Sequence, residues 1–163
     1  MATDKTYLAM DFGAESGRGV VGVLGGGKLR LEEIHRFPNE PVRLLNSLHW
    51  DLPRLFAEIK KAISIAAARH RGLRSLGIDT WGVDFGLLGK GDVLLGNPYH
   101  YRDARTQGMM EAAFALMPRE EIYEHTGIQF MELNSVYQLL AMVRSDSPLL
   151  QVAERLLFIP DLF

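Results

Sequence analysis

Residues 7–24 read YLAMDFGAESGRGVVGVL, and two apolar runs in this segment flank a short glycine-bearing link. The first run, residues 7–12, is typical of a buried strand, and residues 19–24 are typical of a second one. Three glycines at 25–27 favour a turn, because glycine adopts positive φ without steric cost. Residues 28–37 then alternate apolar and polar side chains, which predicts a strand returning beside the second. The chain is therefore expected to open as a three-stranded antiparallel meander.

The remainder of the chain mixes helical and strand patterns. Asp51 is placed to cap a helix, and Gly72 is placed to end it. Its apolar residues recur at helical spacing: Leu52, Leu55, Phe56, Ile59, Ala62, Ile63 and Ala66. Strands are predicted at 76–81, 83–88 and 93–95, helices at 106–117, 120–125, after Asn134 and at 149–157, and a last strand from 158. This order predicts an α/β fold, a mixed sheet flanked by helices.

Composition excludes several classes of protein. The 163 residues are 47% hydrophobic and 23% charged with a net charge of −2, which favours one folded domain without a nucleic-acid partner. The absence of cysteine excludes disulfides, thiolate metal sites and a cysteine nucleophile, and it fits a cytoplasmic location. No stretch approaches the roughly 20 apolar residues of a spanning helix, so no membrane partner is expected.

Residues 11–18, DFGAESGR, form the first segment that could carry chemistry. Backbone N–H groups in a glycine-bearing turn can face a phosphate, because no bulky side chain blocks the approach. Asp11 could hold a divalent ion, while Ser16 and Arg18 offer a hydroxyl and a guanidinium to phosphate oxygens. The alternative is an ordinary hairpin turn with a surface Asp and Arg.

Two further segments are polar at expected strand or helix ends. In residues 77–85, GIDTWGVDF, the glycine at 82 would admit a substrate to the backbone, and Trp81 could stack on a sugar. The alternative is a hairpin with Trp81 in the core and Asp79 capping a loop. In residues 99–106, YHYRDART, the arginines mark either a site or a salt bridge to Asp103.

Taken together with Glu-Ile-His-Arg-Phe at 33–37 and Thr-Gly-Ile-Gln-Phe at 126–130, these segments resemble the rhamnulokinases, a group of the FGGY carbohydrate kinases. The resemblance covers residues 7–163. It implies the actin/hexokinase/Hsp70-like (ribonuclease H-like) ATPase fold. It also implies a kinase that uses Mg²⁺ and transfers the γ-phosphate of ATP to L-rhamnulose, giving L-rhamnulose 1-phosphate and ADP.

The resemblance also implies roles for individual residues. The loop facing the ATP phosphates would comprise Ala14, Glu15, Ser16, Gly17 and Arg18. The side chain of Glu15 should point away from the phosphates, since an acid beside them is repelled. Asp11 would lie near the metal. The sugar would meet the backbone of Gly82, with Thr80, Trp81 and Arg102 around it.

The kinases of this family have two domains, so residues 1–163 are expected to be an incomplete N-terminal sugar-binding domain. The catalytic Asp and the C-terminal ATP-binding domain would lie beyond Phe163, and the rest of the kinase chain would pack against the apolar segment 156–163. The fragment alone is expected to be inactive. Three alternatives stay open: a kinase for L-fuculose or a pentulose, a non-catalytic module that binds sugar or a partner, and an α/β domain whose glycine turns are only turns.

Overall fold

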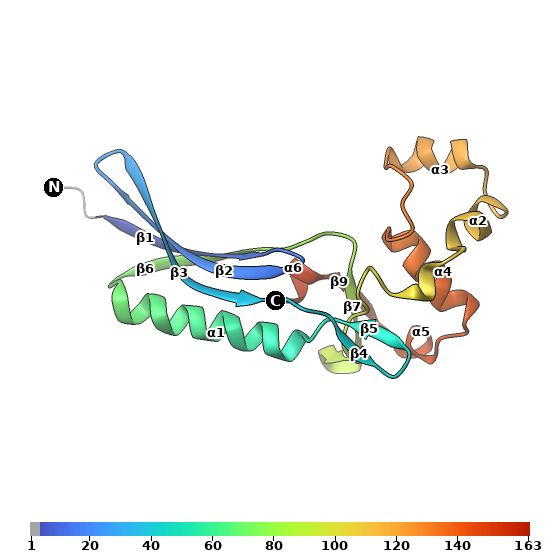
Figure 1. Cartoon of the computed structure of the whole chain (residues 1–163), viewed down its shortest axis with the longest axis horizontal. Helices are drawn as coiled ribbons and strands as arrows, with labels where there is room; N and C mark the ends of the chain where they lie inside the picture. Colours follow the sequence, from blue (N-terminus) through green and yellow to red (C-terminus); the bar gives the residue numbers. More distant parts are fainter. Residues whose placement is uncertain (1–3) are drawn as a thin grey trace. The chain divides into compact units, whose positions relative to one another are not determined.

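The computed structural model describes residues 4–163, which form two compact units. The first unit comprises residues 4–41, 51–82 and 159–163. The second comprises Val42–Trp50 and Val83–Phe158. Figure 1 labels most helices and strands of both.

The first unit is built on a four-stranded sheet, in the order β3-β2-β1-β6. Strands β1 (Lys5–Phe12), β2 (Ser16–Gly25) and β3 (Lys28–Pro38) run antiparallel, so the predicted meander is confirmed. Strand β6 (Leu73–Asp79) lies parallel to β1, which makes the sheet mixed. The two parallel strands end side by side, with Asp11 opposite Asp79.

Helix α1 (Leu52–Arg69) lies along one face of this sheet (Figure 1). The carboxylate of Asp51 accepts a hydrogen bond from the Arg54 N–H at 3.2 Å, which is the predicted N-cap. Its apolar stripe is buried against the sheet core, and Leu55 and Ala62 are fully inaccessible. Burial of this apolar surface holds helix α1 against the face of the sheet.

The end of the chain also packs into the first unit. Short helix α6 (Ile159–Leu162) buries Ile159 completely, and the ring of Phe163 stacks on Phe12 with centroids 5.2 Å apart. The strand predicted to start at 158–159 is wrong from Ile159 onward, because Phe158 is the last residue of strand β9 (Arg155–Phe158) and helix α6 begins at Ile159. Phe158 remains 43% exposed in the second unit.

The second unit combines two small sheets with short helices. Strand β7 (Phe85–Gly89) pairs antiparallel with β8 (Val93–Leu94) and β9 (Arg155–Phe158). Strands β4 (Val42–Leu44) and β5 (Ser47–His49) form a hairpin. The helices are the 3₁₀ turns Lys90–Asp92 and Ala104–Thr106, α2 (Met109–Phe114), α3 (Arg119–Thr126), α4 (Ser135–Arg144) and α5 (Pro148–Val152). No helix within residues 4–163 has the length and apolar character needed to cross a bilayer.

Two predicted helices are wrong in extent. The helix expected at 106–117 is split, because a 3₁₀ turn ends at Thr106 and left-handed Gly108 precedes α2. The helix expected at 149–157 ends at Val152, since residues from Arg155 pair with β7 in antiparallel register. Long-range pairing thus overrides the local helical pattern.

Candidate functional site

The turn between β1 and β2 is closed by its own backbone and by one buried side chain. The Gly13 N–H donates to the Ser16 carbonyl at 2.9 Å. The side-chain amide of Asn39 donates to the Gly13 carbonyl at 2.8 Å, and the Asn39 backbone N–H donates to the Glu15 carbonyl at 2.9 Å. Asn39 is only 1% exposed. Because the carbonyls of Gly13, Glu15 and Ser16 are all hydrogen-bonded within the protein, the turn is ordered in the absence of a ligand.

The predicted loop residues have different surroundings. Ala14 and Ser16 are half-buried and Glu15 is exposed, while Gly17 is buried. A Cβ at Gly17 would lie 2.2 Å from the Phe37 ring, so this glycine is required by packing. Gly17 therefore allows the Phe37 ring to pack against the turn. Asn39, which sequence reasoning does not single out, holds the turn through its hydrogen bonds to Gly13 and Glu15.

Asp11 and Arg18 face each other across adjacent strands. The guanidinium Nη2 and Nε lie 2.6 and 2.8 Å from Asp11 Oδ2. Both side chains are more than 40% exposed, so the pair contributes little stability and remains free to exchange partners. The two predicted ligand-binding groups thus neutralise each other beside the turn.

The residues after β6 belong to the same edge of the sheet. The Thr80 N–H donates to Asp79 Oδ1 at 3.0 Å, and the Thr80 hydroxyl donates to the Trp81 carbonyl at 2.9 Å. Trp81 is half-buried and packs against the core of the first unit. A Cβ at Gly82 would meet no atom within 4 Å, so the backbone there is open. Gly82 is exposed, whereas Thr80 and Trp81 are half-buried.

Val83 opens the second unit in a strained conformation. Its φ of +68° is unusual for a β-branched residue and costs about 1–3 kcal/mol. The Val83 carbonyl accepts a hydrogen bond from the Ser135 hydroxyl at 2.7 Å. The amide of Gln138 also reaches this carbonyl, at 3.4 Å. Helix α4 therefore holds the backbone directly after Gly82.

A buried polar network surrounds Asp84 in the second unit. This carboxylate is fully inaccessible and accepts from the Trp50 indole at 2.6 Å, the Gln138 amide at 2.8 Å and the Tyr101 N–H at 3.2 Å. The Arg105 guanidinium donates to Gln138 Oε1 at 2.6 Å. Burial lowers the pKa of Arg105. The network joins strands and helices that are distant in sequence.

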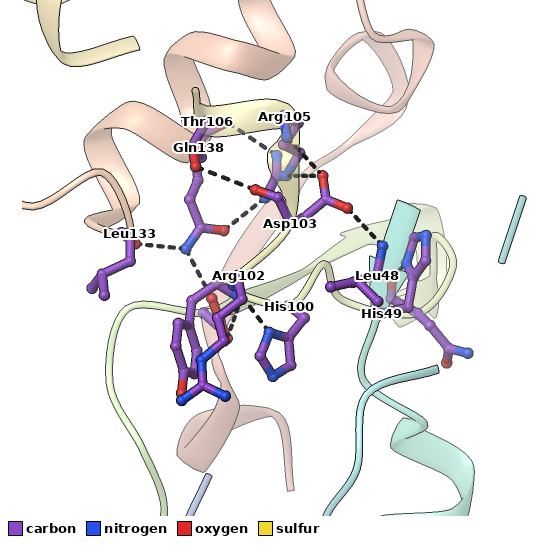
Figure 2. A network of polar contacts seen from close by, with 12 residues as sticks. Leu48, His49, His100, Arg102, Asp103, Arg105, Thr106, Leu133 and Gln138 are labelled. Atoms are coloured by element: carbon purple, nitrogen blue, oxygen red, sulfur yellow. Dashed lines mark hydrogen bonds and ion pairs between the residues drawn. The ribbon is translucent and has the colours of Figure 1, made fainter. Parts of the chain in front are cut away.

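The same network fixes the segment that carries Arg102. Figure 2 shows Asp103 between the Leu48 N–H, at 2.6 Å, and the Arg105 N–H, at 3.0 Å. The Arg102 N–H donates to His100 Nδ1 at 3.0 Å. The Arg102 side chain is exposed, and it lines a hollow of about 650 Å³ with Tyr101, Glu132 and Leu133 among others. The hydrogen bonds of His100 and Asp103 thus hold the backbone on which the exposed Arg102 guanidinium is carried.

His100 makes the stability of this segment dependent on pH. Its ring is 2% exposed and lies 4.1 Å from the Trp50 ring. Burial, and then the Arg102 charge, lower its pKa from 6.5 to about 4. Between these values the unfolded chain binds a proton that the folded chain does not bind. The free energy of unfolding should therefore fall as the pH is lowered from 6.5 towards 4, by about 1.4 kcal/mol per unit.

Urea unfolding of the wild type and of His100→Gln, from pH 7 to pH 4.5, tests this expectation. The variant lacks the titrating ring, so the gap between the two proteins should narrow as the pH falls. Parallel pH profiles would contradict it.

The predicted site residues divide between the two units. Asp11, Ala14–Arg18, Thr80, Trp81 and Gly82 belong to the first unit, and Arg102 to the second. Within residues 4–163 no group of three or more acidic, His or Cys side chains could hold a metal ion alone. Asp11, the predicted metal residue, lies in register with Asp79 on β6. Mg²⁺ commonly takes one or two protein carboxylates and completes its shell with water and phosphate.

Comparisons with known proteins find curated sugar kinases related to this chain in sequence. A scan against models of protein families finds no match. The rhamnulokinase of Oceanobacillus iheyensis is 47% identical over 154 residues, 94% of this chain and 33% of that enzyme. The rhamnulokinase of Bacteroides thetaiotaomicron is 44% identical over 157 residues, 96% of this chain and 32% of that enzyme. The chain thus spans about a third of the length of the curated relatives it matches.

Solved structures of lower identity share the fold. A gluconate kinase from Lactobacillus acidophilus superposes with a TM-score of 0.80 at 17% identity, covering 95% of this chain and 31% of that one. A xylulose kinase from the same organism gives 0.79 at 18% identity, covering 93% and 31%. The expected sugar-kinase fold is therefore confirmed.

Proposed function

Because this chain belongs to the FGGY carbohydrate kinases and is related to rhamnulokinases over nearly its whole length, we propose that it supplies part of the substrate site of a rhamnulokinase. The complete enzyme would transfer the γ-phosphate of ATP to L-rhamnulose, giving L-rhamnulose 1-phosphate and ADP. The observation that carries the proposal is the 47% identity to a rhamnulokinase over 154 residues. The preformed turn beside Asp11 supports it chemically.

The turn at residues 13–17 is suited to phosphate. Asn39 engages the Gly13 and Glu15 carbonyls, which leaves the turn ordered and spares the ligand the cost of ordering it. Arg18 is close enough to offer its guanidinium to phosphate oxygens. Exposed Glu15 can turn its carboxylate to water, away from the phosphates.

Asp11, with Asp79 opposite, would hold Mg²⁺ or its bound waters. When bound, Mg²⁺ neutralises developing charge on the phosphates. Asp11 is paired with Arg18 in the absence of ligands. If Asp11 bound Mg²⁺ instead, the Arg18 guanidinium would be available to a phosphate oxygen.

The sugar would lie against the open backbone of Gly82. Arg102, in the second unit, stays a predicted sugar-binding residue. Thr80 and Trp81 would shape this end of the site by holding the backbone before Gly82. Phosphoryl transfer depends on positioning of both substrates. We place the catalytic Asp, which takes the proton of the sugar hydroxyl, in the two thirds of a kinase that this chain does not span. We propose a cytoplasmic reaction, because ATP would be its co-substrate.

Coupled ADP release from the complete protein, with Mg-ATP and a panel of ketoses, tests the proposal. Turnover should be highest with L-rhamnulose and absent without sugar. Residues 1–163 alone should show no turnover above a no-sugar blank, because the proposed catalytic Asp is missing from them. Highest turnover with L-fuculose or a pentulose would support kinase activity but contradict L-rhamnulose as the substrate. Failure with every ketose would favour a non-catalytic module.

A further inference from the structure

Four charged side chains form a row across the sheet of the first unit. Asp79 on β6 lies opposite Asp11 on β1, and Asp11 lies opposite Arg18 on β2. Arg18 in turn lies opposite Arg36 on β3. Residues directly opposite each other on paired strands point to the same face of a sheet. This charged row therefore has an acidic half, Asp79 and Asp11, and a basic half, Arg18 and Arg36.

The basic half of the charged row brings two like charges together. Adjacent strands lie about 4.8 Å apart, and like charges directly opposite each other destabilise a sheet. Both side chains reach solvent, with 47% of Arg18 and 51% of Arg36 exposed. An anion would relieve this repulsion, because two guanidinium groups one strand apart can share the oxygens of one phosphate chain.

A local irregularity of the sheet supplies Arg36 with an acid of its own. The register between β2 and β3 shifts after Gly19. Glu33 then lies opposite Val20, on the face that carries Arg36. The Glu33 carboxylate accepts from Arg36 Nη2 at 2.6 Å and from Nε at 2.9 Å. This hydrogen bonding is the main cause that lowers the pKa of Glu33, and the Arg18 charge contributes. Because the pair is exposed, it adds little stability and can open for another anion.

Arg36 also contacts the turn between β1 and β2. Its Nη1 lies 3.5 Å from the Ser16 hydroxyl, and Ser16 pairs with Pro38 at the end of β3. Ser16 and Arg18 are both predicted to face the ATP phosphates. Arg36 is thus connected to both predicted residues, to one by contact and to the other by register, although it comes from a different strand.

We propose that Arg36 is a further binding residue for the phosphate chain of a nucleoside triphosphate, and that it acts together with Arg18. The proposal rests on the proposed function, which makes Mg-ATP a substrate. A magnesium nucleotide carries its cation beside its phosphate oxygens, and the charged row likewise has acids beside arginines. On binding, Arg36 exchanges the Glu33 carboxylate for phosphate oxygens, which a guanidinium can also contact through two parallel hydrogen bonds.

Steady-state kinetics of the complete protein, with L-rhamnulose saturating and Mg-ATP varied, test this proposal. Arg36→Gln should raise KM for Mg-ATP about tenfold, the loss typical of a hydrogen bond to a charged group, and should leave KM for the sugar unchanged. Arg36→Lys keeps the charge without the planar fork, so its KM should lie between the two. Arg30→Gln is the matched control, because Arg30 lies on the same strand, is 63% exposed and pairs with Asp4 at 2.8 Å. Its KM for Mg-ATP should stay within about twofold of the wild type.

Glu33→Gln should act in the opposite direction. It removes the acid that competes with phosphate for Arg36, so KM for Mg-ATP should fall about twofold. A merely structural ion pair would make Glu33→Gln and Arg36→Gln alike, because each breaks the same contact: the thermal midpoint would fall and KM for Mg-ATP would not separate them. Equal KM values in these two variants, or a KM in Arg36→Gln no higher than in Arg30→Gln, would overturn the proposal while turnover itself upholds the kinase.

Absence of turnover with every ketose would instead overturn the proposed function. Calorimetric titration with Mg-ATP then decides the role of Arg36 separately. The dissociation constant should be about tenfold higher in Arg36→Gln than in the wild type and in Arg30→Gln. Equal dissociation constants, or no binding of Mg-ATP to the wild type, would overturn the inference.

Discussion

Gly82→Val is expected to lower kcat/KM for the sugar at least about 100-fold in the complete protein without unfolding it. A valine side chain would occupy the space where we place the sugar, and a small displacement of a reacting hydroxyl is costly in rate. The fold should tolerate the change, because a Cβ at this position meets no atom within 4 Å. The measurements are sugar-dependent ADP release and the thermal midpoint of unfolding.

Gly82→Ala supplies the graded control. It adds one carbon in place of three, so its loss of kcat/KM should be clearly smaller, and most of it should appear in KM. Wild-type kinetics in Gly82→Val would contradict the role of this backbone in sugar binding. A large drop in the thermal midpoint would instead show that position 82 matters for folding.

Asp84→Ala should destabilise the second unit by about 3–5 kcal/mol, the largest stability effect that we expect. The substitution leaves the Trp50 indole, the Gln138 amide and the Tyr101 N–H without their buried acceptor. Unsatisfied buried donors cost far more than a lost surface contact. Urea unfolding followed by circular dichroism measures the change.

Two matched variants accompany this experiment. Asp84→Asn keeps one acceptor oxygen, so an intermediate loss is expected. Asp4→Ala removes an aspartate that is 51% exposed and paired with Arg30, and it should cost less than about 1 kcal/mol. If Asp84→Ala were as stable as Asp4→Ala, the buried network would not carry the stability assigned to it.

Local patterns predict the meander and helix α1 of the first unit. Alternating strands joined by glycines 25–27 predicted the meander, and the stripe from Leu52 to Ala66 predicted α1 together with its cap at Asp51. Both features depend on neighbours within a few residues. The segments near Asp11 and Gly82 are predicted as candidate sites on the same local basis, because glycine beside acidic and hydroxyl groups at strand ends is visible within a few residues.

The second unit depends on contacts between distant residues. Residues 155–158 form strand because they pair with residues 85–88, and no helical or strand periodicity within the segment itself reveals this. The sequence pattern does not predict the hairpin of β4 and β5, because it lies in a polar stretch that follows two prolines. Trp50, Asp84 and Gln138 meet across 34 and 54 residues of sequence, so only the fold brings them together. Asn39 likewise acts across 26 residues on Gly13.

The strand order β3-β2-β1-β6 bears on how the polypeptide acquires its shape during synthesis. The first three strands pair with immediate neighbours, so their ladder can form soon after residue 38 has left the ribosome. Strand β6 must instead wait until α1 has emerged, because its partner β1 lies more than 60 residues earlier. The turn beside Asp11 can therefore form with the nascent meander, whereas the sheet edge that pairs Asp11 with Asp79 is completed later in translation.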